Sequence, residues 1–127
     1  MIQKESILNI IDNSGAKLGR CIKVNKGYKC RYGTVGDVIT LSIKNLRSKR
    51  RLLSKVKKGS VCKGLIIRSK ITRIDFSGSN VAFDENSIIL LTKKNKLLGT
   101  RIFGKLPKLL RFSRYLKLIS LSSGIIY

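Results

Sequence analysis

The chain has 127 residues, which suits one compact domain with a modest hydrophobic core. Lysine and arginine number 28 against 6 acidic residues, so the net charge is +22, and self-repulsion of this size implies a polyanionic partner. With 43% hydrophobic residues the chain is not wholly disordered, and with no histidine it lacks the commonest general base.

Short apolar segments alternate with small turns along most of the chain. Strands are predicted at residues 7–11, 21–24, 38–43, 61–74, 81–83 and 88–92. In the third segment Ile39, Leu41 and Ile43 alternate with hydroxyl residues, so they share one face of a strand. Turn-forming residues occupy 12–15 and 76–80. Many short strands at close spacing indicate a mainly β fold, a small antiparallel β-barrel.

The C-terminal quarter departs from this pattern. Leu106, Leu109 and Leu110 fall on one helical face, and Pro107 is tolerated in a first turn. A short helix is therefore predicted at about 106–114, followed by a strand at 115–121. Because no repeat or linker is recognisable, residues 1–127 are predicted to form a single domain.

Basic residues concentrate between Val38 and Ile74, where the sequence contains twelve of them and no acid. A solvated loop is the ordinary interpretation of a charge run, but a run without interspersed acids repels itself in water. We therefore expect a projecting β-ribbon at about 44–60, with its tip within 47–53, that follows phosphates. Its apolar side, formed by Leu52, Leu53 and Val56, would contact a neighbouring protein.

These considerations give a set of candidate RNA-binding cations from the ribbon, the following strand and the predicted helix. They are Lys44, Arg47, Lys49, Arg50, Arg51, Lys55, Lys57, Lys58, Arg68, Lys70, Arg111 and Arg114. Aromatic residues make up only 6% of the chain, so recognition by shape and backbone is favoured over base stacking. Phe83, Phe103 and Phe112 are expected in the core, whereas Tyr28 and Tyr32 fit either the core or an RNA contact.

Other classes of function find little support. The three cysteines are far apart and form no C-x-x-C pair, so we expect reduced thiols and no structural metal or cofactor. The acids mostly adjoin turns, so no catalytic cluster is expected. Apolar runs fall short of the roughly 20 residues that a membrane-spanning helix needs. No signal or transit peptide is recognisable at 1–6, so we expect the protein to act where it is made.

Six blocks in order resemble the L-fourteen family of large-subunit ribosomal proteins. The blocks are 8–24, 31–39, 55–68, 77–90, 99–104 and 117–121. Each block alone is weak, but six with nearly the family's spacing make a specific match. Residues 122–126 lack the Pro and Glu of the family's pattern, which favour the first turn of a helix, so they give no support to the family's small terminal helix.

The resemblance implies a closed five-stranded β-barrel with a projecting ribbon and a short C-terminal helical region. It implies a non-enzymatic constituent of the large subunit that binds large-subunit rRNA and helps form an intersubunit bridge to small-subunit rRNA. Implied neighbours are large-subunit ribosomal proteins three and nineteen. A ribosome-silencing factor docks in the family on the block matched by Thr100, Arg101 and Lys117.

Composition also bears on origin and on rival functions. Alanine and proline are scarce while Ile, Lys and Asn abound, as an A+T-rich genome produces, and a mitochondrially encoded protein of the matrix fits this best. A plastid, an A+T-rich bacterium and a processed nuclear product stay open. The rival functions are a cationic barrel that coats nucleic acid in general and a protein that binds anionic lipid.

Overall fold

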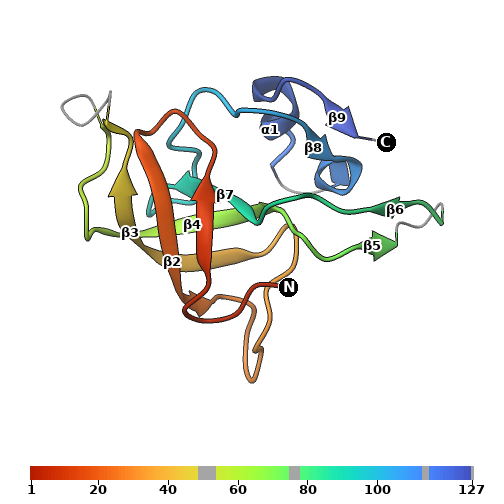
Figure 1. Cartoon of the computed structure of the whole chain (residues 1–127), viewed down its shortest axis with the longest axis horizontal. Helices are drawn as coiled ribbons and strands as arrows, with labels where there is room; N and C mark the ends of the chain where they lie inside the picture. The colour runs from red at the N-terminus through yellow and green to blue at the C-terminus, as the bar shows by residue number, and fades with distance from the viewer. Residues whose placement is uncertain (49–53, 75–77, 113–114, 127) are drawn as a thin grey trace.

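Five strands close into a barrel in the computed structural model, which describes residues 1–48, 54–74, 78–112 and 115–126 (Figure 1). They are β1 (Ile7–Ile10), β2 (Ala16–Val24), β3 (Val38–Leu46), β4 (Val61–Arg68) and β7 (Ser87–Leu91). Neighbours pair in the order β1-β2-β3-β4-β7. Parallel pairing of β7 with β1 closes the barrel, and its other pairings are antiparallel. The predicted mainly β, closed five-stranded barrel is confirmed.

Apolar side chains on both faces of β4 and β7 build two cores. In β3, Ile39, Leu41 and Ile43 fill the interior, as their alternation predicts. Ile66 of β4 joins this interior core, whereas its neighbours Leu65 and Ile67 face outward into a second core. Strands buried on both faces carry continuous apolar runs instead of alternation.

The C-terminal segment covers the outer face of β4 and β7 and supplies the second core. It contains β8 (Leu106–Pro107), the 3₁₀ helix η2 (Lys108–Phe112), α1 (Lys117–Leu121) and β9 (Ile125–Ile126). Leu106, Leu110 and Leu118 are fully buried there against Leu65, Ile67 and other residues of the two strands. Within the described ranges, no helix has both the length and the apolar character to cross a membrane.

Helix and strand predictions for this segment need correction. The helix predicted at 106–114 is a 3₁₀ helix over 108–112, because Leu106 and Pro107 pair in parallel with Ile125 and Ile126. The strand predicted at 115–121 is wrong, since α1 occupies 117–121. A helical turn lets Leu118 reach the second core while Lys117 and Ser120 stay exposed.

Two strands also differ from their predicted extents. β2 begins at Ala16, five residues earlier than expected, because register shifts along its pairing with β3 break the alternation that marks a strand. The strand predicted at 61–74 ends at Arg68. After it, β5 (Arg73–Ile74) pairs with β6 (Asn80–Val81) in a hairpin that extends away from the barrel (Figure 1). The predicted turn at 76–80 lies partly outside the described residues.

Of the ribbon predicted at 44–60, the structure describes residues 44–48 and 54–60, and strand pairing between β3 and β4 stops before these arms; the ribbon itself stays a prediction. β3 pairs with β2 up to Leu46. Its strand pairing with β4 reaches Ser42 and Val61, beyond which Ile43 N donates to Ser60 O at 3.0 Å and Gly59 N donates to Ile43 O at 2.8 Å. The returning segment folds back on the barrel end, where Lys55 N donates to Ser14 O at 2.9 Å and Val56 is only 8% exposed in the interior core. Burying Val56 fills the end of the barrel, so it is not available to a neighbouring protein. The predicted tip, residues 49–53, lies outside the described residues.

Arg68, at the end of β4, fastens the C-terminal segment to the barrel. Its Nε donates to Lys105 O at 2.9 Å and its Nη2 donates to Phe103 O at 2.8 Å. Its Nη1 lies 3.6 Å from Glu85 Oε1, and the guanidinium stacks 5.6 Å from the centre of the Phe83 ring. Burial lowers the pKa of this guanidinium from its ordinary value, and the nearby Glu85 opposes that shift.

The turn around Gly104 depends on that contact. Gly104 has φ of +87°, and a Cβ there would collide with Arg68 Nη2. A side chain would therefore be strained by the backbone and would displace the guanidinium. The arrangement indicates that Arg68 is a structural clamp between β4 and the turn before β8.

Replacing Arg68 with Lys tests this role because the charge is kept and the fork of donors is removed. We expect Arg68→Lys to lower the free energy of unfolding by about 1–3 kcal/mol, since the carbonyls of Phe103 and Lys105 lose charged hydrogen-bond partners. Urea denaturation at constant salt measures this. The control Arg111→Lys, at an exposed position, should change stability by about 0.5 kcal/mol or less. If Arg68→Lys is as stable as the wild type, Arg68 is not a clamp.

Candidate nucleic-acid interface

Most of the described acidic side chains already have partners, in one buried hydrogen-bond cluster or in single ion pairs, so they neutralise few of the surface cations. Asp12 is buried, accepts hydrogen bonds from Ser14 N at 3.0 Å and Leu90 N at 2.8 Å, and also accepts one from Ser14 Oγ. Glu5 pairs with Arg20 at 3.1 Å. The ion pairs of Asp37 and Glu85 are equally local. Asp84 is exposed, and Asp75 lies outside the described residues.

Cations gather at the barrel end where β3 leaves the sheet. An open hollow of about 550 Å³ is lined by Lys17, Asn45, Leu46, Ser48 and Lys58. A second hollow of about 610 Å³ shares Lys17 and Ser48 with it. We call the exposed side chains of Lys17, Lys44, Lys57 and Lys58, together with half-buried Arg47, the barrel-end surface. Lys17 was not predicted, because the shifted register of β2 conceals that it faces the same hollow as Lys58.

Arg47 lies at the edge of this surface, in the second hollow. Its Nη2 donates to Ile10 O at 3.1 Å, and its guanidinium stacks 5.0 Å from the centre of the Phe103 ring. Phe103 is 42% exposed and belongs to this wall of the hollow, so its prediction as a core residue is wrong. Phe83 is half-buried under Arg68, and the side chain of Phe112 is not described.

The other predicted cations are dispersed or engaged. Lys55 is exposed, but its Nζ donates to Leu98 O at 3.1 Å. Arg68 is the clamp described above, and its side chain is only 12% exposed. Lys70 and Arg111 are exposed on the segment after β4 and on η2, away from the barrel-end surface. Four further candidates lie outside the described residues: Lys49, Arg50, Arg51 and Arg114.

Thr100, Arg101 and Lys117 are all exposed. Asn13 holds the first two, because its Oδ1 accepts from Thr100 N at 2.7 Å and from Arg101 N at 3.4 Å, and its Nδ2 donates to Thr100 Oγ1 at 2.8 Å. Gly99 permits this approach, since a Cβ there would lie 2.8 Å from Asp12 Cβ. Ile102 N donates to Leu121 O at 3.0 Å, which ties the block to the end of α1.

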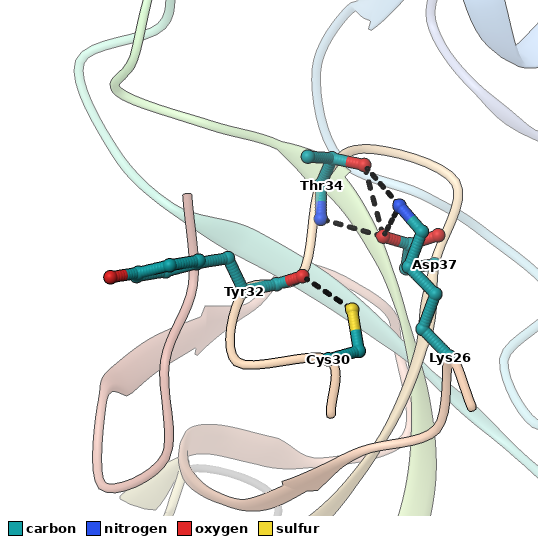
Figure 2. Close-up of polar contacts among 5 residues, drawn as sticks. All are labelled: Lys26, Cys30, Tyr32, Thr34 and Asp37. Carbon is teal, nitrogen blue, oxygen red and sulfur yellow. Dashed lines mark hydrogen bonds and ion pairs between the residues drawn. The ribbon is translucent and has the colours of Figure 1, made fainter. Parts of the chain in front are cut away.

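The loop between β2 and β3 borders a further hollow with a cationic lining, separate from the two at the barrel end, which was not predicted as a site. Figure 2 shows that Asp37 Oδ2 accepts from Lys26 Nζ at 3.0 Å, Thr34 N at 2.7 Å and Thr34 Oγ1 at 2.9 Å. The Tyr32 ring points away from this cluster (Figure 2). Tyr32 is 44% exposed and Tyr28 is 92% exposed, so neither belongs to the core.

The cysteines are free. Cys21 is fully buried in the interior core, and Cys62 packs partly against it. Burial, with a smaller contribution from the carboxylate of Glu5, raises the pKa of the Cys21 thiol, so this sulfur is a packed side chain and not an active nucleophile. Cys30 is half-buried and its Sγ donates to Tyr32 O at 3.5 Å.

Comparison with known protein families gives a match that spans nearly the whole chain. The family of ribosomal protein L14p/L23e matches residues 1–126, and the closed barrel with one short α-helix is consistent with its fold. Proteins of this family are structural, non-enzymatic constituents of the large ribosomal subunit and act in translation. The chain therefore belongs to the ribosomal protein L14p/L23e family and is a constituent of the large ribosomal subunit.

Proposed function

We propose that the chain binds large-subunit rRNA through the barrel-end surface and helps form an intersubunit bridge to small-subunit rRNA. The observation that carries this proposal is the separation of charges. Lys17 and Lys58 line a hollow that has no acidic side chain in its lining. In the neighbouring hollow the acidic side chain is Glu85, which is paired with Arg68, and most other acidic side chains are held in ion pairs or buried hydrogen bonds. Phosphates would neutralise these cations and remove their mutual repulsion.

The arrangement favours recognition of folded RNA by its backbone. Lys17 and Lys58 are flexible point charges, which neutralise phosphates without reading bases. Lys44 and Lys57 would extend the same contact. Lys49, Arg50 and Arg51, which lie outside the described residues, are proposed as phosphate contacts from the sequence alone. Arg47 would contribute its remaining donors from a fixed orientation over Phe103.

Protein partners follow from membership of the family. We propose contacts with large-subunit ribosomal proteins three and nineteen, and docking of a ribosome-silencing factor on Thr100, Arg101 and Lys117. Exposure of all three residues and the rigid support from Asn13 favour such docking. Within the cell, the ribosome of the mitochondrial matrix fits the A+T-rich composition best, with plastid and bacterial ribosomes as alternatives.

The alternative is a cationic barrel that coats nucleic acid without preference. Sedimentation of a tagged chain in lysate separates the two functions. We expect the chain to sediment with large subunits and to leave that fraction after nuclease treatment. Association with bulk DNA, or equal affinity for duplex DNA and folded rRNA at the same salt, would contradict the proposal.

Charge removal at the hollow provides a quantitative test. The double variant Lys17→Ala/Lys58→Ala should weaken binding to large-subunit rRNA and make the log–log salt dependence shallower by about 0.7–0.9 for each phosphate that is no longer neutralised. Filter binding over a salt series measures both quantities. Lys96→Ala/Lys105→Ala removes the same charge from exposed positions elsewhere and should keep the wild-type slope. Equal slopes in the two variants would argue against the barrel-end surface.

Charge reversal at Arg101 tests the docking block. We expect Arg101→Glu to abolish recovery of the silencing factor with isolated large subunits, because an exposed cation at the centre of the block becomes an anion. Incorporation into the subunit should be unchanged. Lys96→Glu, at another exposed position, serves as the control. Full recovery of the factor with Arg101→Glu would remove this block from the docking site.

A further inference from the structure

The loop between β2 and β3 presents two tyrosine rings beside a hollow of about 1270 Å³. Its cationic and aromatic lining consists of Lys4, Lys23, Tyr28, Lys29, Arg31 and Tyr32. In Figure 1 the loop hangs from the barrel near the N-terminus, on the side away from the end of β3. It is therefore a surface distinct from the barrel-end surface.

The base of this loop is fixed while its tip is presented to solvent. Asp37 gathers Lys26 and Thr34 at the base (Figure 2). Gly33 and Ile2 exchange backbone hydrogen bonds at 2.7 and 2.8 Å, and Asn25 Nδ2 donates to Thr40 Oγ1 at 3.0 Å. These contacts hold the loop against the N-terminal segment and β3, so the hollow has defined walls.

Exposure of Tyr28 is unusual for a residue that normally buries much of its ring. The residue is 92% exposed, and Lys29 Nζ lies 5.4 Å from the centre of its ring. A side chain of this kind offers an open aromatic face next to a flexible cation. Proteins use that combination to stack an unpaired base and to neutralise the phosphate beside it.

The positive charge of the hollow favours an anionic ligand over a neutral or cationic one. No acidic side chain lines it among the residues that the structure describes. The nearest candidates are occupied, because Glu5 pairs with Arg20 and Asp37 pairs with Lys26. A ligand that suits four cations and two exposed rings is an anion that also has a flat apolar surface. A nucleotide has both features, and a lipid headgroup lacks the flat apolar surface.

We propose that this hollow binds an unpaired nucleotide of RNA, with Tyr28 as the stacking platform and with Lys4, Lys23, Lys29 and Arg31 along the flanking phosphates. The inference rests on the proposed function, since it assigns a second contact to the same RNA partner. It adds recognition of an unpaired base to an interface that otherwise follows the backbone. Tyr32 forms the other wall of the hollow.

The test uses the full chain and an oligouridylate of about twelve nucleotides, within the size that a small barrel covers, against an RNA duplex of the same length. Tyr28→Leu should weaken binding of oligouridylate about five- to hundredfold, the range expected when one stacked base loses its platform. The salt slope should not change, because no phosphate contact is removed. Tyr28→Phe keeps the ring and should bind as the wild type, and duplex affinity should be equal in all three proteins.

A second readout does not depend on affinity. The chain has no tryptophan, so Tyr28→Trp introduces a single tryptophan, whose fluorescence can be excited apart from that of the remaining tyrosines and should be quenched by oligouridylate and not by duplex. Unchanged emission, undiminished binding by Tyr28→Leu, or the same quenching with oligoglutamate or anionic vesicles would overturn the assignment.

Failure of the proposed function would look different. It would appear as a wild-type salt slope for rRNA binding by Lys17→Ala/Lys58→Ala, and as failure of the tagged wild-type chain to sediment with large subunits. Neither result alters the oligouridylate response at Tyr28.

Discussion

Burial of β4 and β7 on both faces is the constraint on which the rest of the structure depends. Their inner side chains close the barrel interior, and their outer ones need a second cover. The C-terminal segment supplies that cover with Leu106, Leu110 and Leu118. Because a short chain must fill two cores, almost every apolar side chain of these strands is buried in one core or the other. Basic residues therefore lie on the outward positions of the strands, as Arg20 and Lys63 do, and in the loops and the exposed face of the C-terminal elements.

The same constraint explains which parts of the fold could be predicted. β3 has one face on the interior, so the alternation of Ile39, Leu41 and Ile43 marks it directly. β2 is bulged, so its first half shows no such period. The helix α1 was mistaken for a strand because only Leu118 in it is fully buried, and a single turn gives too little periodicity to separate the two.

The kind of ligand could be predicted from the sequence, but the location of the residues that would bind it could be predicted less well. A run of cations without acids indicated an RNA-binding element, but Val56, which was expected on an exposed apolar side of that element, is buried at the barrel end. Lys17 was missed because its position depends on irregular pairing between distant segments. Phe103 was placed in the core on the basis of residue type alone, whereas its neighbour Arg47 provides a partner that lets the ring stay at the surface. In both cases the deciding contact joins residues far apart in sequence.

The lysine and arginine side chains have two roles in this protein. Which role a side chain has depends on how many of its hydrogen-bond donors are already bonded within the fold. Arg68 gives two donors to carbonyls of the turn at 103–105, faces Glu85 and lies over Phe83, so little of its hydrogen-bonding capacity points outward. Arg47 is intermediate, with one donor given to Ile10 O. Lys58 is exposed on a hollow that has no carboxylate among its lining residues. An anion gains most where the fold has left donors unused, so the side chains that hold this protein together are poor candidates for RNA contact. The chain's net charge therefore overstates its binding surface, and the exposed lysines at the barrel end and in the β2–β3 loop define that surface better.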